Sequence, residues 1–457
     1  MTMNIVKERS FYTKAASIAL PIAAQSLITI GVNIMDTIMV GDLGEVALSA
    51  TSLANQFINI FHICCMGLGM GASVLTARFW GMKDLVSLKK TITIMLRICI
   101  ALATAFALVT AVAPAFVMSI YSPEADIIKA GTRYFNWSVA SYWLLGMSLT
   151  MTIVLRSVGQ AWLPLLTSII AFFVNIGANY IFIFGKFGAP AMGVAGAALG
   201  TLIARAFEFI MIDGYVFFVD KKIGYRIRDL LGKCNDMLRE YLRVSIPVLV
   251  SDTLLGLGNS AVAIVMGHIG SSFVSANAIT TVTQQLSTVF ISGISQSSCM
   301  VIGHTLGEGD LQRAKTEGNT FLLLGTAIGI LAGGFIMLIS PLIISFYNIT
   351  PETKAIAQEL MLAIGLIVVF QSMNSILTKG VMRGGGDTKF LMVADILFLW
   401  IVSIPVGAIA GLVLHLPAFW IYVCLKLDQI IKAIWCIGRF RSNLWIKAVH
   451  GVGHSKG

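Results

Sequence analysis

The stretch PIAAQSLITIGVNIMDTIMVGDLG, residues 21–44, returns 226 positions later as PVLVSDTLLGLGNSAVAIVMGHIG, residues 247–270. The residues that end or bend helices coincide in the two copies, and the agreement continues beyond these stretches. The coinciding residues are Pro21 with Pro247, Gly41 with Gly267, Gly44 with Gly270, Gly67 with Gly293, Gly81 with Gly307 and, one residue later, Arg156 and Gly159 with Arg383 and Gly386. The sequence therefore predicts a duplicated bundle, an arrangement typical of membrane transporters.

The composition is that of an integral membrane protein. The 457-residue chain is 57% hydrophobic and only 12% charged, which is too apolar for a water-soluble domain. A span needs roughly 20 residues of helix, because lipid offers no partner for free backbone groups. Twelve apolar runs are long enough, near 15–40, 50–76, 92–118, 134–155, 163–185, 193–219, 243–267, 275–302, 318–346, 357–378, 390–414 and 418–437. We expect an all-α protein with twelve transmembrane helices in two pseudo-symmetric six-helix lobes.

The basic residues predict how the chain is oriented. The predicted lobes are residues 1–219 and 243–457, and a polar cytoplasmic linker at 220–242 joins them. Lys and Arg are frequent in this central connection but sparse in the loops of the opposite face, which hold Lys129, Arg133, Lys186 and Lys354. By the positive-inside rule, both termini of this multi-pass cell-membrane protein are cytoplasmic. The net charge of +10 reflects that topology, and it does not indicate nucleic-acid binding.

No motif for nucleotide or metal chemistry is present in the sequence. The loops are short and contain no GxxxxGK[ST] motif, so we expect transport that uses no ATP and runs downhill or on an ion gradient. The seven cysteines have no CxxC spacing and no accompanying histidine cluster, which argues against disulfides, zinc and other cofactors. The expected partners are membrane lipid and a small-molecule substrate, and we expect a monomer.

Asp36 is the strongest candidate for a functional residue. An Asp at the centre of a span costs roughly 2.5–3.5 kcal/mol, and the repeat places Val262 at the corresponding position. Asn175 and Asn179 share one helix face, and Thr201 adds a hydroxyl one helix later. A carboxylate with amide and hydroxyl oxygens can hold a proton or a hard cation such as Na⁺. The alternatives are ion coupling at Asp36 and ordinary hydrogen bonding between helices.

Asp252 is the corresponding buried acid of the second half, where the first half has Ser26. It is expected to contact a cationic substrate, to form a second coupling site, or to have a structural role. Gln284 and Asn374 are weaker candidates for the lining of a substrate cleft.

The other charged residues within predicted spans have simpler explanations. Arg205 and Glu208 are spaced i, i+3, so we expect them to pair with each other. Asp213 lies near the cytoplasmic end of its span, where water is close. We expect aqueous or paired partners for Asp395, Lys426 and Asp428.

Several stretches are similar to one known family. ALPIAAQSLITIGVNIMDTIMVGDLG resembles the first helix of the multidrug and toxic compound extrusion (MATE) family, and NIGANYIFIFGKFGAPAMGVAGAALGTLIAR resembles its fifth and sixth helices. RSVGQ and RGGGDTK resemble the paired cytoplasmic turns after its fourth and tenth helices. The similarity extends from about residue 14 to residue 448. It implies a twelve-helix, two-lobed exporter that exchanges organic cations for H⁺ or Na⁺.

The resemblance also assigns roles to single residues. Asp36 corresponds to the coupling residue of the first helix, and Asn175, Asn179 and Thr201 correspond to the polar residues of that site. Some members carry Asp-Pro where this chain has Asn179-Tyr180. Asp36 is then the only acid of the four, which favours a single proton over a tight Na⁺ site.

Two other functions compete with drug export. A flippase for lipid-linked precursors from the same superfamily would have extra helices or a strongly cationic central cavity, and the sequence indicates neither. An intramembrane enzyme would need a catalytic set, but the histidines at 62, 268, 304 and 415 lie far apart in the sequence. We therefore expect that the protein is not an enzyme.

Overall fold

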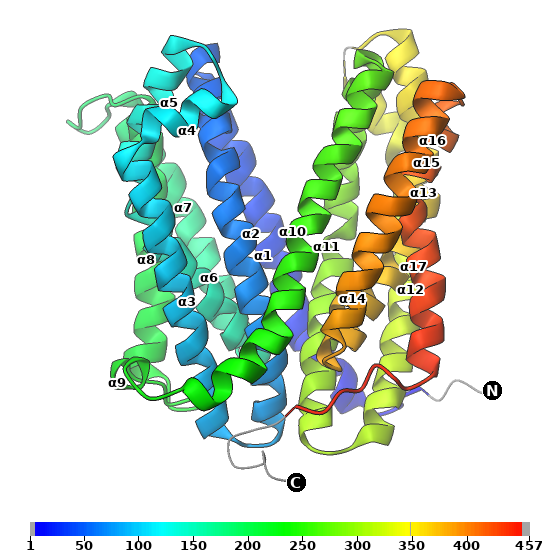
Figure 1. Ribbon diagram of the computed structural model, residues 1–457. Helices are drawn as coiled ribbons and strands as arrows, with labels where there is room; N and C mark the ends of the chain where they lie inside the picture. The colour runs from blue at the N-terminus through cyan, green and yellow to red at the C-terminus, as the bar shows by residue number, and fades with distance from the viewer. Residues whose placement is uncertain (1–4, 348, 450–457) are drawn as a thin grey trace. The chain divides into compact units, whose positions relative to one another are not determined.

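The computed structural model describes residues 5–347 and 349–449, and within these ranges every regular element is a helix. Gly386 and Ile446 form an isolated β-bridge, and no β-strand occurs among the described residues. The all-α fold expected from the sequence is confirmed. Figure 1 traces the helices from blue at the N-terminus to red at the C-terminus.

The helices of the first half follow the apolar runs of the sequence. They are α1 (Arg9–Gly41), α2 (Glu45–Gly81), α3 (Leu85–Val112), α4 (Pro114–Tyr121), α5 (Ala125–Ser138), α6 (Ser141–Ser157), α7 (Trp162–Phe184), α8 (Val194–Gly214) and η1, a π-helical extension of α8 (Tyr215–Val219). A short helix, α9 (Ile227–Leu230), lies in the central connection.

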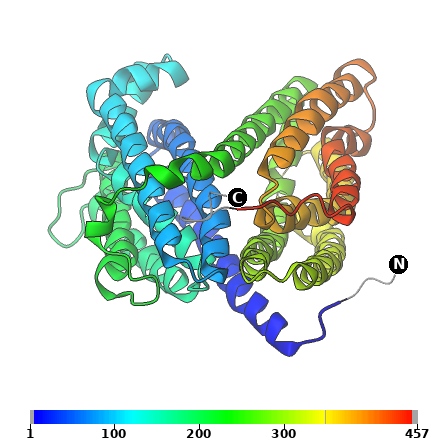
Figure 2. The same cartoon turned by 60° about the horizontal axis from the view of Figure 1, so that its bottom comes forward.

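The second half repeats this order with more π-helical segments. Its helices are α10 (Asn235–Ile269), α11 (Ser271–Gly307), α12 (Leu311–Ser345), α13 (Pro351–Ser375), η2 (Ile376–Met382), α14 (Thr388–Asp395), η3 (Ile396–Ser403), α15 (Ile404–Ala408), η4 (Ile409–Val413), α16 (Ala418–Leu425) and α17 (Leu427–Arg441). Figure 2 shows many helices of each half nearly end-on.

Within the described ranges, nine helices are long and apolar enough to cross a membrane, and the bent pair α5–α6 raises the number to ten. The bend between α5 and α6 is 59°. The two remaining predicted spans form α8 with η1 and α16 with α17. These helices carry charged side chains, namely Arg205, Glu208, Asp213, Lys426, Asp428 and Lys432. In addition, α16 has 8 residues and α17 has 15, so neither helix alone is long enough to cross a membrane.

The repeat seen in the sequence is visible in the helix ends. Asp84 and Asp310 occupy the same position of the repeat, and each caps the helix that follows it. The Asp84 carboxylate accepts a hydrogen bond from the Ser87 backbone N–H at 3.0 Å, and Asp310 accepts one from that of Arg313 at 2.9 Å. Such caps satisfy backbone N–H groups that a helix start leaves free. The same local chemistry therefore starts α3 and α12.

By internal packing, the described residues divide into two units. The C-terminal unit contains the described residues within 1–23, 77–83 and 243–450. The N-terminal unit contains the residues within 24–76 and 84–242. The first helix of the chain thus changes unit just after Pro21.

The start of α1 is part of the core of the C-terminal unit. The rings of Phe11 and Phe321 pack edge to face with their centroids 5.1 Å apart, and both side chains are buried. The Ser297 hydroxyl donates a hydrogen bond to the Ala15 carbonyl at 2.9 Å. These contacts fix residues 9–23 in the unit formed by the second half of the chain.

The central connection is held against α3. The Arg97 guanidinium donates hydrogen bonds to the carbonyls of Leu230 at 2.7 Å and Gly232 at 2.9 Å. The buried Asp220 carboxylate accepts hydrogen bonds from the backbone N–H groups of Ile223 at 2.8 Å and Gly224 at 3.2 Å. The connection is therefore anchored within the N-terminal unit.

Helices α12 and α13 approach closely where glycine replaces a side chain. A Cβ atom at Gly333 would collide with the backbone of Gly365 on α13, whereas one at Gly334 would meet no atom within 4 Å. Small residues at a crossing allow two backbones to pack directly, which stabilises helices in lipid. A methyl group should therefore disturb the packing of α12 and α13 at Gly333 but not at Gly334.

We expect Gly333→Ala to lower the free energy of unfolding by about 1–3 kcal/mol, because the added methyl group forces α12 and α13 apart. Gly334→Ala is the matched control and should be neutral or slightly stabilising, since alanine favours a helix more than glycine does. Thermal unfolding of the purified variants in detergent measures the difference. Equal melting temperatures for the two variants would contradict the close approach at Gly333.

Candidate functional site

Asp36 meets the asparagine pair of α7 inside the N-terminal unit. The Asn179 side-chain amide donates a hydrogen bond to the Asp36 carboxylate at 2.6 Å. The same amide lies 3.4 Å from the Asn175 side-chain oxygen, one turn earlier on α7. Asn175 and Asn179 are 3% and 1% exposed, and Asp36 is half-buried. Three of the four residues predicted from the sequence are therefore in direct contact.

A glycine on α8 makes room for this contact. A Cβ atom at Gly200 would lie 3.0 Å from the Asn179 backbone nitrogen and would overlap the Asn179 side-chain oxygen. Thr201, the fourth predicted residue, is the next residue of α8 and interacts with the side chain of Tyr134 on α5. The close approach of α7 and α8 holds the Asn179 amide in its place against Asp36.

Sequence reasoning missed two further members of this cluster. The buried Tyr134 on α5 donates a hydrogen bond from its hydroxyl to the Asn55 side-chain oxygen on α2 at 3.2 Å, and it interacts with Thr201. Arg205 pairs with Glu208 at 2.7 Å, as expected, and it also interacts electrostatically with Asp36. Tyr134 lies on α5, which meets α6 at a bend that the sequence pattern did not predict.

The C-terminal unit contains a polar cavity of about 190 Å³. Gln284 and Asn374, two predicted residues, both line it. Gln284 donates a hydrogen bond to Gln371 at 2.8 Å, and Asn374 donates one to the Gln429 side-chain oxygen at 2.8 Å. All four amide side chains line the cavity.

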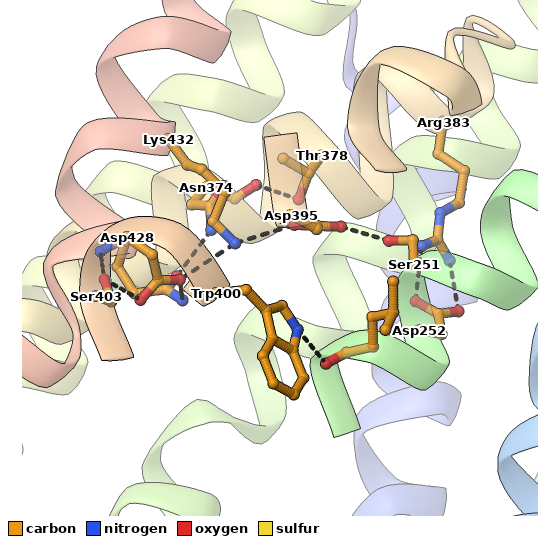
Figure 3. A network of polar contacts seen from close by, with 12 residues as sticks. Ser251, Asp252, Asn374, Thr378, Arg383, Asp395, Trp400, Ser403, Asp428 and Lys432 are labelled. Atoms are coloured by element: carbon orange, nitrogen blue, oxygen red, sulfur yellow. Dashed lines mark hydrogen bonds and ion pairs between the residues drawn. The ribbon is translucent and has the colours of Figure 1, made fainter. Parts of the chain in front are cut away.

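A buried lysine lies between two aspartates at this cavity (Figure 3). The Lys432 ammonium is 3.0 Å from the Asp395 carboxylate and 3.2 Å from that of Asp428. Ser251 donates to the second oxygen of Asp395, and Ser403 donates to Asp428 at 3.4 Å. The expectation of paired partners for Asp395 and Asp428 is confirmed, but Lys432 was not identified as the partner from the sequence.

Asp252 lies elsewhere, in a two-point ion pair with Arg383. The guanidinium nitrogens are 3.0 and 3.4 Å from the two carboxylate oxygens, and the Arg383 side chain is only 5% exposed. Asp252 is not among the residues that line the cavity. The structure thus brings Gln284 and Asn374 to one cavity and places Asp252 against the arginine shared by the repeats.

The equivalent arginine of the first half makes a similar contact. Arg156 donates a hydrogen bond to Gln25 on α1, and Gln25 also donates one to Ser168 on α7 at 2.7 Å. Both arginines therefore bind the first helix of their repeat a few residues after its proline, Pro21 in α1 and Pro247 in α10.

The expectation for Asp213 was wrong. Its side chain is not near water but fully buried, and among the described residues neither carboxylate oxygen has a hydrogen-bond partner. Asp213 lies on α8, which packs against α6 and α7. Sequence position along a span therefore did not reveal how deeply the residue is covered.

A duplicated bundle of apolar helices with buried polar clusters has the features of a membrane transporter. The MatE family model matches the chain twice, at residues 21–181 and 247–409. The chain therefore belongs to the MatE family, which consists of transporters and not of enzymes. The starts of the two matches lie as far apart as the two copies of the repeat, and the resemblance found in the sequence is confirmed.

Curated relatives match most of the chain at low identity. One is "Probable multidrug resistance protein NorM" of Agrobacterium fabrum, 26% identical over 87% of this chain and 86% of the relative. Another, with the same name, is from Thermotoga maritima and is 23% identical over 94% of this chain and 92% of the relative.

Solved structures share the fold. An outward-facing multidrug resistance MATE family transporter of the MOP superfamily has a TM-score of 0.84 at 19% identity, covering 96% of this chain and 99% of that one. A MOP superfamily transporter from Pyrococcus furiosus, with a binding pocket of reverse polarity, also has a TM-score of 0.84, at 20% identity over 95% and 96% of the two chains.

We expect Lys432→Met to destabilise the C-terminal unit strongly, because it leaves Asp395 and Asp428 as unpaired buried charges. The loss should be about 3–5 kcal/mol. Lys447→Met is the matched control: Lys447 is 3.6 Å from Asp387, and its side chain is 40% exposed, so its loss should cost below about 1 kcal/mol. The melting temperatures of the two purified variants measure the difference. Similar melting temperatures for Lys432→Met and Lys447→Met would mean that Lys432 is not part of a buried charge pair.

Proposed function

We propose that the protein is a secondary active exporter that exchanges lipophilic organic cations for H⁺, or for Na⁺, by alternating access. Family membership supports transport, and the names of the relatives from Agrobacterium fabrum and Thermotoga maritima support multidrug resistance. The observation that carries the ion-coupling part is the contact of Asp36 with the buried Asn179 amide.

The surroundings of Asp36 suit a carboxylate whose charge changes during transport. A charged group in an apolar bundle is costly unless partners stabilise it. Asn179 supplies a hydrogen bond, and Arg205 supplies a favourable electrostatic interaction at longer range, while its own ion pair is with Glu208. Because the ion pair of Arg205 is with Glu208, the Asp36 carboxylate is not held in an ion pair and can accept a proton. A neutral Asp36 would then no longer attract a cationic substrate.

In this scheme the coupling ion and the drug are linked through the charge of the Asp36 carboxylate. Binding of the coupling ion lowers the affinity for the drug, and by linkage the drug lowers the affinity for the ion by the same factor. Asn175, Asn179 and Thr201 position Asp36 and tune its charge. Exchange follows when the accessible side of the protein alternates between the two binding events.

The donor set favours a proton over Na⁺. Asp36 is the only acid among the four predicted residues, and Asn179 presents its amide N–H to the carboxylate. A hard metal cation requires several oxygen ligands.

The remaining assignments complete the proposal. We place the protein in the cell membrane with both termini in the cytoplasm, working as a monomer, without ATP and with membrane lipid as its surroundings. Gln284 and Asn374 belong to the substrate-facing wall of their cavity. Asp252 has a structural role as the partner of Arg383.

We expect Asp36→Asn to abolish drug efflux, because the neutral amide can neither take up a proton nor attract a cation. Asp42→Asn is the matched control, since Asp42 is exposed just beyond the end of α1. Efflux of ethidium from energised membrane vesicles measures the result. The coupling role of Asp36 is wrong if Asp36→Asn vesicles expel ethidium as fast as Asp42→Asn vesicles do.

The coupling ion can be identified in proteoliposomes with one gradient imposed at a time. We expect a proton gradient to drive ethidium transport and a Na⁺ gradient to have no effect, because the Asp36 cluster has a single acid. Substrate-induced proton movement, followed with a pH-sensitive dye, provides an independent reading. Transport driven by Na⁺ alone would overturn the preference for H⁺.

A further inference from the structure

The residues after the last helix, 442–449, run against the turn that follows η2 (red in Figure 2). The Lys447 backbone N–H donates a hydrogen bond to the Gly385 carbonyl at 2.8 Å. One position earlier, Ile446 forms the isolated β-bridge with Gly386. We call residues 442–449 the strap, and its docking site is the turn of residues 383–387.

A tryptophan anchors the strap. Trp445 is fully buried, and its ring packs against that of Phe440 on α17 with the centroids 5.5 Å apart. A Cβ atom at Gly385 would lie 2.3 Å from the Trp445 ring, so the glycine makes room for the indole. Lys447 adds an ion pair with Asp387 at 3.6 Å. Burial of an aromatic ring of this size stabilises the docked strap through the hydrophobic effect.

The strap and the turn together enclose an arginine from the first half of the chain. The Arg78 guanidinium donates hydrogen bonds to the Lys447 carbonyl of the strap and, at 2.9 Å, to the Gly385 carbonyl of the turn. Arg78 is only 3% exposed. Hydrogen bonds from a charged donor are roughly twice as strong as those between neutral groups. Lifting the strap would therefore remove one strong contact of Arg78.

Arg78 belongs to a helix that is divided between the two units. Residues 77–83, at the end of α2, belong to the C-terminal unit, whereas the rest of α2 belongs to the N-terminal unit. Two glycines pack closely at this attachment, where a Cβ atom at Gly81 would lie 3.0 Å from the Gly307 Cα atom. Any movement of one unit against the other therefore acts on residues 77–83.

The first half has an equivalent contact, which is more deeply buried. The offset between the two Arg-x-x-Gly turns also relates Gln160 to Asp387, and it relates Asp220 to Lys447. Gln160 donates a hydrogen bond to Asp220 at 3.0 Å, so the segment after η1 contacts its turn as the strap contacts its own. Asp220 is 1% exposed, whereas the Lys447 side chain is 40% exposed. The contact of the second half is therefore open to water, as a releasable contact requires.

We propose that the strap is a latch that opens in each transport cycle. The docked strap holds Arg78, and with it residues 77–83, in the C-terminal unit. When the strap lifts, these residues are free to move with the rest of α2. This regulation rests on the proposed alternating-access function, but the docking of the strap can be measured without transport.

A reversible disulfide between the strap and the turn tests whether the latch must open. A Cβ atom at Gly386 would lie 3.5 Å from the Lys447 Cβ atom. Disulfides join Cβ atoms that are about 3.5–4.5 Å apart. We expect the oxidised double variant Gly386→Cys, Lys447→Cys to export no ethidium from energised membrane vesicles, and dithiothreitol to restore export. Mass spectrometry of the purified protein measures the crosslinked fraction.

The single variants Gly386→Cys and Lys447→Cys are the matched controls, and both should respond to the oxidant as the unmodified protein does. They account for the strain of a side chain at Gly386, whose φ angle is +83°, and for the loss of the Lys447 ion pair. Undiminished export by the fully crosslinked variant would show that the strap stays docked throughout the cycle, and it would overturn the proposal.

Hydrogen exchange of the purified full-length protein tests the docking itself. In Trp445→Ala we expect the backbone amides of residues 77–83 to exchange about 100-fold faster, as the loss of a large buried ring gives. Residues 360–368 of α13 pack in a different core cluster from Trp445, and their exchange should not change. Equal acceleration in α13, or none in residues 77–83, would overturn the latch.

Lys447→Glu is a milder second variant that keeps Trp445 in place. It replaces the ion pair with Asp387 by two like charges, and we expect exchange in residues 77–83 to rise about fivefold. Lys389→Glu is its matched control, because Lys389 is exposed on α14, and it should leave exchange unchanged. Equal exchange in the two variants would overturn the docking contact that we infer for Lys447.

The two readouts separate this proposal from the export function. If neither the reduced double variant nor the unmodified protein exports ethidium, the proposed function fails, and hydrogen exchange in Trp445→Ala still decides on the docking of the strap. If both export ethidium and the crosslinked variant does so equally well, only the latch is refuted.

Discussion

A polar side chain within an apolar helix bundle must find its partner on another helix, and this constraint explains the architecture of both units. Asp36 on α1 is held by Asn179 on α7, and Lys432 on α17 joins Asp395 on α14. Arg383 reaches back to Asp252 on α10. Water is absent as an alternative partner in the hydrocarbon, so each such pair fixes the rotation of two helices at once.

Much of the fold follows from the repeat alone. The aligned glycines predicted helix ends, and Gly41, Gly81 and Gly307 do end helices. Asp84 and Asp310 start equivalent helices. Local signals of this kind depend on nearby backbone groups, which a sequence displays directly. Helical spacing predicted that Asn175 and Asn179 share one face of a helix, and the two side chains are in contact, with Asn179 also bound to Asp36.

The remaining features depend on which face of one helix meets another, and sequence spacing does not determine this. Tyr134 on α5 contacts Asn55 on α2, a pairing of two helices that the spacing of residues along either helix does not predict. Lys432 pairs with Asp395 across 37 positions of sequence, and the burial of Asp213 results from neighbours on other helices. A single sequence shows which residues are polar or charged. Tertiary packing determines their partners and their burial, and position along a span does not reveal either.

The exchange of helix starts between the units bears on how such a chain could have arisen. Arg9 and Asn235 occupy the same position of the repeat, and each begins a helix. Residues 9–23 belong to the unit of the second half, while residues 235–242 belong to the unit of the first. A single ancestral half would therefore have been complete only as a pair with exchanged segments, as in a domain-swapped dimer. Fusion of two copies would have made that exchange permanent within one polypeptide.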